Sequence, residues 1–246
     1  VEPLHGYTVV DLSDGIAGAY ATKMLADGGA TVVDVEPPHG DSMRRWSAFG
    51  AEVDVDAGGA LFSFLGCSKH SVVADPGSTD DIEFVHRLLA SADAVVWSPD
   101  GAVGRHPSLA PAEIHRRHPH LVVTAITPFG LHGPWRDRPA TEFTLQAWSG
   151  GAVGLGRGSQ DRAPVHIGGQ VGDWLAGAYA AAMTLASRVR ALRDGRGELI
   201  DLSALEAQIL GLTYYPVTYF QVLDRPWRSE RRPTVPGVAE AADGLV

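Results

Sequence analysis

Short runs of β-branched and apolar residues alternate with helical patterns along the first half of this 246-residue chain. The helical segment 19–29 ends at two glycines, and the helical segment 78–91 has Ser78 in the position of an N-cap. Strands that alternate with helices require right-handed crossovers, which build a parallel sheet covered on both faces. The alternation therefore predicts an α/β fold with a Rossmann-like parallel sheet flanked by helices. The predicted strands are 7–13, 30–36, 70–75, 92–98 and 120–127.

The amino-acid composition changes in the second half of the chain. Residues 128–162 are rich in glycine, proline and tryptophan around one short helical run, "ATEFTLQAWSGG". We expect one Rossmann-like large domain over 1–225 and an extended linker toward a further small domain over 226–246, which is basic and broken by prolines. Because the last four residues look like a turn into a new strand, we expect a piece of a longer chain. The predicted elements here are a helix starting at Ser108, a long helix (173–193), a strand (198–203) and a helix (204–220).

The composition is that of a globular protein and excludes some binding modes. Apolar residues make up 45% of the chain, charged residues 20%, and the formal net charge is −9. An acidic chain matches nucleic acid and membrane surfaces poorly. Cys67 is the one cysteine, so no disulfide forms within the chain, and the longest uncharged apolar stretch, 174–187, is too short to span a bilayer. We expect a cytoplasmic protein with no nucleic-acid and no membrane partner.

Two loops at predicted strand ends could meet a phosphate. The turn after the first strand (13–18) lacks the G-x-G-x-x-G pattern of dinucleotide-binding folds, which weakens an NAD-dependent oxidoreductase as an interpretation. Arg44 and Arg45 in "PPHGDSMRRW" suit an anionic ligand, although a solvated or ion-paired loop explains them equally well. Lys69 precedes the third strand, where its ammonium could also reach phosphates.

The motifs favour neither a metal site nor a serine nucleophile. The sequence has no G-x-S-x-G and no H-E-x-x-H pattern. His115, His118 and His120 form the densest histidine group, but they lie with arginines at a predicted helix end, where such side chains stabilise the last carbonyls. We therefore expect no metal.

The stretch "GGQVGDWLAGAYAAAM" (168–183) holds one acid, Asp173, between a glycine-rich turn and an alanine-rich helix. Aspartate is a preferred N-cap, so the residue types allow a purely structural role. They also allow a presented nucleophile, because the glycines permit close approach of a substrate and leave backbone amides for an oxyanion. A helix N-terminus would in addition keep the carboxylate ionised.

Taken together, these segments resemble the class III CoA-transferases, a family that includes formyl-CoA transferase, the carnitine and bile-acid CoA-transferases and the α-methylacyl-CoA racemases. The resemblance implies the large domain of a transferase that moves CoA from an acyl-CoA thioester to a carboxylic acid, with coenzyme A as part of the substrate. It rests on blocks in the family's order: "VVDLSDGIAGAYATKMLADGGATVVDVEPPHGD", "SKHSVVAD", "ADAVV", "ITPFGLHGPW", "QAWSGG", "GDWLAGAYAA" and "GRGELIDLSALEAQIL".

The resemblance also implies roles for individual residues. Asp173 falls on the family's nucleophile, which forms an acyl-aspartyl anhydride and then an aspartyl-CoA thioester. Glu142 matches a supporting acid beside that nucleophile. The family's CoA-binding segments fall on Ile16, Ala17, Arg44, Lys69, Ser98 and Arg105.

The chain departs from the family's pattern at several of these segments. Gly66 replaces the asparagine of the family's N-x-x-K step, and Trp97-Ser98-Pro99 replaces an E-N-F segment, so the adenine pocket must be built differently. Ile16 and Pro37 stand where formyl-CoA transferase has a glutamine and an arginine, which argues against formyl-CoA as the substrate.

Two alternatives stay open from the sequence. The family's racemases carry a His-Asp step where this chain has Thr141-Glu142, which favours a transferase, with His166 as a relocated histidine that could restore proton exchange. The other alternative is a CoA- or acyl-CoA-binding half without turnover. It applies if the chain is a fragment or one half of a fused pair, because the family's subunits continue beyond this length and two of them interlock as a homodimer.

Overall fold

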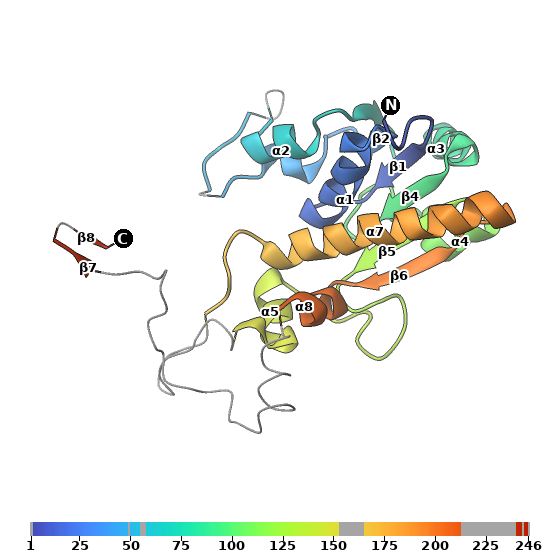
Figure 1. Cartoon of the computed structure of the whole chain (residues 1–246). Helices are drawn as coiled ribbons and strands as arrows, with labels where there is room; N and C mark the ends of the chain where they lie inside the picture. Colours follow the sequence, from blue (N-terminus) through green and yellow to red (C-terminus); the bar gives the residue numbers. More distant parts are fainter. Residues whose placement is uncertain are drawn as a thin grey trace, which may run out of the picture.

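Six parallel strands form one sheet in the order β3-β2-β1-β4-β5-β6, which confirms the predicted α/β class (Figure 1). The computed structural model describes residues 2–48, 50–54, 58–152, 165–212, 240–242 and 244–245. The strands are β1 (Thr8–Leu12), β2 (Thr31–Glu36), β3 (His70–Val73), β4 (Ala94–Trp97), β5 (Val122–Thr127) and β6 (Leu199–Ser203).

Helices cover both faces of this sheet. The helices α1 and α7 pack against each other on one face, whereas α3 and α4 lie on the opposite face (Figure 1). The helices are α1 (Ile16–Asp27), α2 (Ala60–Leu65), α3 (Thr79–Ser91), α4 (Pro111–Arg117), α5 (Glu142–Ser149), α7 (Val171–Asp194) and α8 (Ala204–Leu212), with 3-10 turns η1 (Ser42–Arg45) and η2 (Pro107–Leu109).

The first strand shows how the two layers of the core arise. Val9 packs with α1 and α7, whereas Val10 and Leu12 pack with α3 and α4. Successive side chains of a strand point to opposite faces, so a strand covered on both faces reads as a continuous apolar run. Asp11 is the polar exception, and its carboxylate accepts a hydrogen bond from Thr22 of α1 at 2.5 Å.

One predicted helix start is confirmed and one is wrong. Ser78 caps α3 with its side chain, as predicted. The next helix, α4, begins at Pro111 and not at Ser108, because proline lacks the N–H that a first helical position leaves unpaired. Ser108 lies in η2, where its hydroxyl is 3.0 Å from His86 Nε2 and 2.9 Å from His106 Nδ1.

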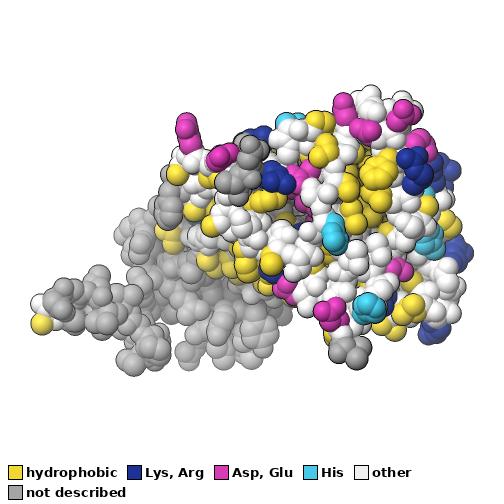
Figure 2. All heavy atoms as spheres, turned by 90° about the horizontal axis from the view of Figure 1, so that it is seen from above, with side chains coloured by type: hydrophobic (Ala, Val, Ile, Leu, Met, Phe, Trp, Pro, Cys, Tyr) yellow, Lys and Arg dark blue, Asp and Glu magenta, His cyan; other side chains and the backbone are white. Residues whose placement is uncertain are grey.

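The C-terminal predictions fall largely outside the described residues. The predicted helix 204–220 is described up to Leu212, and of the predicted linker 226–246 only 240–242 and 244–245 are described. There β7 (Glu240–Ala241) and β8 (Gly244–Leu245) pair in antiparallel fashion. None of the described helices combines the length and the apolar character needed to cross a membrane. In the described part of the face drawn in Figure 2, acidic and basic side chains are interspersed.

Candidate active site

Two adjoining cavities lie at the carboxyl ends of the central strands. The first, of about 180 Å³, is lined from the loops after β1, β4 and β5 and from the starts of α1, α5 and α7. The strand order reverses between β1 and β4, and ligand crevices of open α/β sheets lie at such a switch point. A second cavity, of about 300 Å³, shares Asp14, Gly15, Ile16, Asp100 and Asp173 with the first. Asp173 therefore lies in the wall where the two cavities meet.

Asp173 does not cap its helix. The helix α7 begins at Val171, two residues earlier than the sequence pattern suggests, and the residue before it, Gln170, has a left-handed backbone with φ of 58°. The Asp173 amide donates to the Gln170 carbonyl at 3.0 Å, but no side chain of the segment caps the helix. The capping interpretation of Asp173 is therefore wrong. Its carboxylate has no hydrogen-bond partner among the described residues.

Glu142, which belongs to a different helix, accepts a hydrogen bond from a backbone amide in the first turn of α7. It is the first residue of α5, which Thr141 caps. Glu142 Oε1 accepts hydrogen bonds from the Gly172 amide and from Gln146 Nε2, both at 2.7 Å, and Oε2 accepts one from Gln208 Nε2 at 3.2 Å. All three partners are N–H donors, which is the pattern around a carboxylate. Because Glu142 satisfies a first-turn amide of α7, the Asp173 carboxylate stays available.

A close contact between helices fixes the direction of Asp173. Gly177 follows Asp173 by four residues and so lies on the same side of α7. A Cβ on Gly177 would be 2.5 Å from the carbonyl oxygen of Ala17, so the two backbones approach more closely than any side chain allows. This contact holds the first turns of α1 and α7 together beside the loop that follows β1.

The surroundings make Asp173 a weak acid. Burial, followed by the negative charges of Glu142 and Asp100, raises the pKa of Asp173 from its ordinary value of 3.8 to about 7. The helix N-terminus therefore does not hold the pKa of this group down, because desolvation and two neighbouring acids outweigh the helix dipole. A carboxyl group with a pKa near 7 changes charge readily at neutral pH, as groups at reaction centres do.

Three of the predicted CoA-binding residues meet in this cleft. Ile16 and Ala17 begin α1 and line the smaller cavity, and Ile16 packs with Met43 of η1. Ser98 directly follows β4 and is buried, and its hydroxyl accepts a hydrogen bond from the Asp14 amide at 2.9 Å. That hydrogen bond ties together the two loops that border the switch point.

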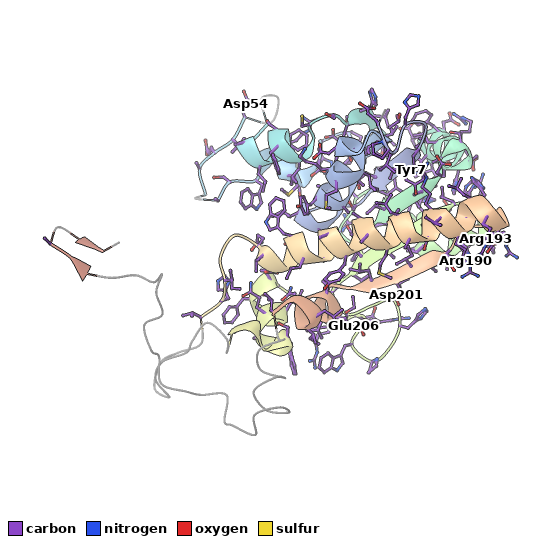
Figure 3. The ribbon with its side chains drawn as sticks, in the orientation of Figure 1. Tyr7, Asp54, Arg190, Arg193, Asp201 and Glu206 are labelled. Atoms are coloured by element: carbon purple, nitrogen blue, oxygen red, sulfur yellow. The ribbon has the colours of Figure 1, made fainter. Side chains whose placement is uncertain are left out.

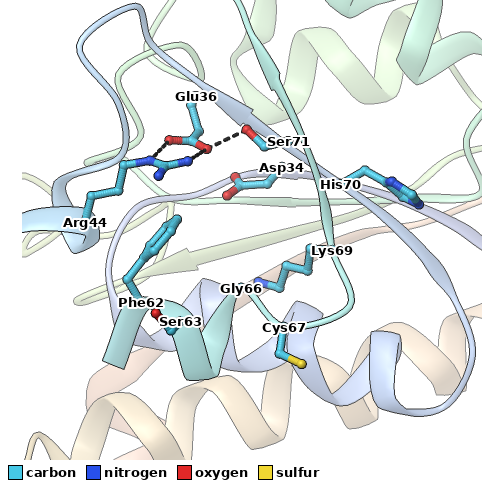
Figure 4. Close-up of a pocket in the computed structure, with 10 residues that line it drawn as sticks. All are labelled: Asp34, Glu36, Arg44, Phe62, Ser63, Gly66, Cys67, Lys69, His70 and Ser71. Carbon is cyan, nitrogen blue, oxygen red and sulfur yellow. Dashed lines mark hydrogen bonds and ion pairs between the residues drawn. The ribbon is translucent and has the colours of Figure 1, made fainter. Parts of the chain in front are cut away.

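A separate cavity of about 290 Å³ lies beside the second half of β2 and the start of β3 and is lined by Arg44 and Lys69 (Figure 4). Arg44 donates from Nε and Nη2 to the Glu36 carboxylate at 2.5 and 2.7 Å, and its guanidinium lies 4.3 Å from the ring centroid of Phe62. Burial alone would raise the pKa of Glu36, but hydrogen bonds from Arg44, Ser71 and a backbone amide lower it to about 2. Of the two interpretations of Arg44, the structure contains the ion-paired one.

The Lys69 ammonium is bound within the protein. Its side chain is 4% exposed, and Nζ donates to Thr22 Oγ1 at 2.7 Å and to the Ala19 carbonyl at 2.9 Å, with Asp11 Oδ2 at 3.5 Å. Burial and the charge of Asp11 raise the pKa of Asp34, its neighbour in register on β2, and Lys69 opposes that rise. Lys69 therefore supplies the positive charge beside Asp11 and Asp34, and its contact with CoA stays a prediction.

Arg105 is exposed on the loop after β4, and no carboxylate of the described residues pairs with it. Its amide donates to the Gly101 carbonyl at 3.0 Å. A Cβ on Gly101 would lie 2.1 Å from the Leu12 carbonyl oxygen, so this loop passes directly over the end of β1. Of the three cations predicted to bind CoA, Arg105 is the one whose charge the described residues leave unpaired.

The histidines do not assemble a metal site or a proton-exchange pair in the described cleft. His118 Nε2 lies 3.3 Å from His86 Nδ1 in the layer of α3 and α4, and no three potential ligands among the described residues are placed to hold a metal. His166 is exposed, its Nδ1 is 3.0 Å from the Ile167 carbonyl, and it lines neither cavity beside Asp173.

Several residues of the site escaped the sequence analysis, Asp100 and Gln208 among them. Asp100 lies in the loop after β4 and lines both cavities. An acid just beyond a buried strand was the signal that could have found it. Gln208 contacts Glu142 from α8, 66 residues further along the chain, and no local pattern connects the two.

Known proteins resemble this chain in sequence and in fold. A model of CoA-transferase family III matches residues 4–246. The chain is 32% identical over 226 residues to succinate–glutarate CoA-transferase of Agrobacterium fabrum. The aligned region covers 88% of this chain and 54% of that relative. The chain is 30% identical over 222 residues to succinyl-CoA–D-citramalate CoA-transferase of Chloroflexus aurantiacus, covering 89% and 53%. A crystal structure of a CAIB/BAIF family protein from Brucella suis matches with a TM-score of 0.82 and 27% identity, covering 99% of this chain and 65% of that one.

The chain spans about half the length of the curated relatives it matches. The matched region nevertheless contains Asp173, Glu142 and every described residue that lines the cleft. This chain belongs to CoA-transferase family III.

Proposed function

We propose that this chain carries the reactive carboxylate of an enzyme that transfers CoA between an acyl-CoA and a free carboxylic acid, with Asp173 as the nucleophile. The observation that carries the proposal is the Asp173 side chain, which lies between two cavities, does not cap its helix and has no hydrogen-bond partner among the described residues. An unpartnered acid in a concave site destabilises the fold, and such groups concentrate at active sites.

In the proposed reaction, an Asp173 oxygen attacks the carbonyl carbon of the thioester. The C–S bond breaks, CoA leaves as a thiolate, and a mixed anhydride joins the acyl group to Asp173. The thiolate then attacks the aspartyl carbonyl, which releases the donor acid and leaves CoA as a thioester on Asp173. The acceptor carboxylate repeats the two steps in reverse, so a new acyl-CoA leaves and the Asp173 carboxylate is regenerated without a net proton change.

The surroundings of Asp173 support both roles of this group. The pKa of about 7 leaves a large fraction ionised for attack at neutral pH. Loss of the charge on acylation relieves the repulsion from Glu142 and Asp100, so the buried site stabilises the neutral acyl-aspartyl form relative to the free carboxylate. Glu142, held by Gly172 and two glutamines, keeps its position while the charge of Asp173 changes.

We assign the CoA portion to the loops after β1 and β4, where Ile16, Ala17 and Ser98 line the cleft. The guanidinium of Arg105, which no carboxylate of the described residues pairs with, suits a phosphate, whereas Arg44 and Lys69 would have to exchange their present partners. The rest of the cleft belongs, in this proposal, to the interlocked homodimer expected from the family resemblance. The free, exposed Cys67 fits a reducing, cytoplasmic setting for the reaction.

The charges lining the cleft bear on the acyl group. Asp14, Asp100, Glu142 and Asp173 line the two cavities, and no described lysine or arginine does. Succinyl-CoA is named as a substrate of several relatives. For a donor of that class, the partner of the second carboxylate would have to come from outside the described residues. We therefore include both succinyl-CoA and the uncharged acetyl-CoA as probes.

Intact-mass spectrometry of the chain after incubation with each acyl-CoA tests the proposal, with peptide mapping after hydroxylamine treatment. We expect an adduct on the peptide that contains Asp173, and none in Asp173→Asn. The matched control is Asp194→Asn at the other end of the same helix, where Asp194 pairs with Arg190 and Arg193. Figure 3 labels these two arginines at that end of α7. Saturable CoA binding without any adduct would instead identify a binding half, and a nucleophilic role for Asp173 would be refuted.

A further inference from the structure

Gln208 is a buried amide whose polar contacts are incomplete. Its side chain is 0% exposed on α8, Nε2 donates to Glu142 Oε2 at 3.2 Å, and Oε1 has no partner among the described residues. A buried amide oxygen without a partner destabilises the fold, and a leucine or methionine would avoid that loss. The residue type therefore calls for a role other than packing.

The second buried glutamine beside Glu142 provides the contrast. Gln146 is also 0% exposed, but its Nε2 donates both to Glu142 and to the Ile167 carbonyl, and its Oε1 accepts from the Ile167 amide at 2.8 Å. Gln146 thus has a complete set of partners and tethers the segment around Ile167. Gln208 has no such tether, and its one polar contact among the described residues is Glu142.

The contact between Gln208 and Glu142 lies beside Gly172, the residue before the proposed nucleophile Asp173. A Cβ on Gly172 would lie 2.0 Å from Gln208 Nε2 and 2.6 Å from Glu142 Oε2, so the amide and the carboxylate together fill the space above Gly172. The Gly172 amide donates to Glu142, and Asp173 is the next residue. Gln208 is the one described donor to Glu142 Oε2, so it decides whether both carboxylate oxygens are held.

We propose that Gln208 is a positioning residue for the nucleophile: it holds the Glu142 carboxyl group against the start of α7, which leaves Asp173 unpaired at the cleft. The inference rests on the proposed function of Asp173. Without the Gln208 donor, one Glu142 oxygen is buried unsatisfied, which favours rotation of the Glu142 side chain away from α7. That rotation weakens the negative field at Asp173 and frees the Gly172 amide of α7 to compete for the Asp173 carboxylate.

The test is Gln208→Met, which keeps the length of the side chain and removes its amide, with Leu205→Met as the control on the same helix. Carboxyl-carbon NMR of the ¹³C-labelled chain, with the Asp173 signal assigned through Asp173→Asn, gives the pH midpoint of Asp173 without any acyl-CoA. We expect a lower midpoint in Gln208→Met than in wild type and no change in Leu205→Met.

The adduct assay supplies the second readout. We expect Gln208→Met to slow adduct formation at pH 7 by about tenfold at saturating succinyl-CoA or acetyl-CoA. The half-saturating donor concentration should stay the same, because Gln208 lines neither cavity. In a Glu142→Gln background the same substitution should have no further effect, since the two residues act as one unit. That comparison holds even if Gln208→Met loses some stability.

The two proposals fail in different ways. An unchanged Asp173 midpoint in folded Gln208→Met, or an equal loss of rate with and without Glu142, would overturn the positioning role. If wild type forms no adduct while the midpoint still falls in Gln208→Met, the nucleophile proposal fails and the control of Asp173 by Gln208 is retained.

Discussion

Replacing Asp173 with asparagine should stabilise the protein at alkaline pH and leave its stability nearly unchanged in acid. The pKa of Asp173 is about 7 in the folded chain and near 3.8 when unfolded, so the folded state holds a proton that the unfolded state has lost between these values. Stability that the protonated group contributes is therefore lost as the pH rises through 7. Asparagine has nearly the same shape and carries no charge at any pH.

The size of the effect follows from the same numbers. A rise from 3.8 to about 7, at 1.36 kcal/mol per pKa unit, corresponds to a ceiling of about 4 kcal/mol. Asp173 is half-buried beside cavities that water can enter, so we expect about 1–2 kcal/mol of this ceiling. The same carboxylate is the proposed nucleophile, so the stabilised variant should form no adduct, which is the usual relation between stability and activity.

Urea unfolding of wild type, Asp173→Asn and Asp194→Asn at pH 5 and pH 8 measures the difference. The stability of Asp173→Asn relative to wild type should increase by about 1–2 kcal/mol between the two pH values. Asp194 is exposed, so its variant should show no comparable increase. An equal relative stability at both pH values would mean that Asp173 is not a buried, repelled acid, and the electrostatic reasoning would be refuted.

Three further perturbations test other parts of the fold by the same unfolding assay. Gly177→Ala should destabilise by about 1–3 kcal/mol, because its Cβ meets the Ala17 backbone oxygen, and unchanged stability would contradict the close helix contact. Arg44→Gln should destabilise by about 2–3 kcal/mol at pH 7 by leaving Glu36 buried and unpaired. Since the pKa of Glu36 is about 2, that loss should shrink as the pH falls toward 2, and a pH-independent loss would argue for packing alone. Burial and neighbouring cations lower the pKa of His86 to about 4, so wild type should lose up to about 3 kcal/mol between pH 6.5 and 4, and His86→Gln should show a smaller loss.

The sequence predicted those parts of the fold that depend on neighbours along the chain. The run "TVVDL" reads as a buried strand because both of its faces are covered, and Ser78 caps its own helix. The start of α4 was mispredicted although Pro111 gave a local signal for it. The Ser108 hydroxyl does not cap α4 and instead lies beside the rings of His86 and His106. His86 is 22 residues away along the chain, so no local sequence pattern shows this contact.

The candidate site likewise has parts that the sequence predicted and parts that depend on residues distant along the chain. The resemblance located Asp173 and Glu142, but it could not tell whether Asp173 caps α7, because the group that satisfies that helix comes from α5, 30 residues earlier. The charge on Lys69 suggested a phosphate partner. In the structure the lysine is used to balance Asp11 and Asp34, which are far apart in sequence and opposite each other in register.

The charge of Glu142 beside Asp173 makes the raised pKa of Asp173 a property of the assembled tertiary structure. A peptide of residues 165–195 would keep the helix-forming sequence but lack α5 and α8, so its aspartate would titrate as an ordinary exposed acid. A nascent chain reaches residue 195 before α8 has emerged, and at that length Glu142 lacks its Gln208 donor. The raised pKa of Asp173 therefore depends on residues from other parts of the chain, Glu142 and Asp100, and not on the helix that carries it.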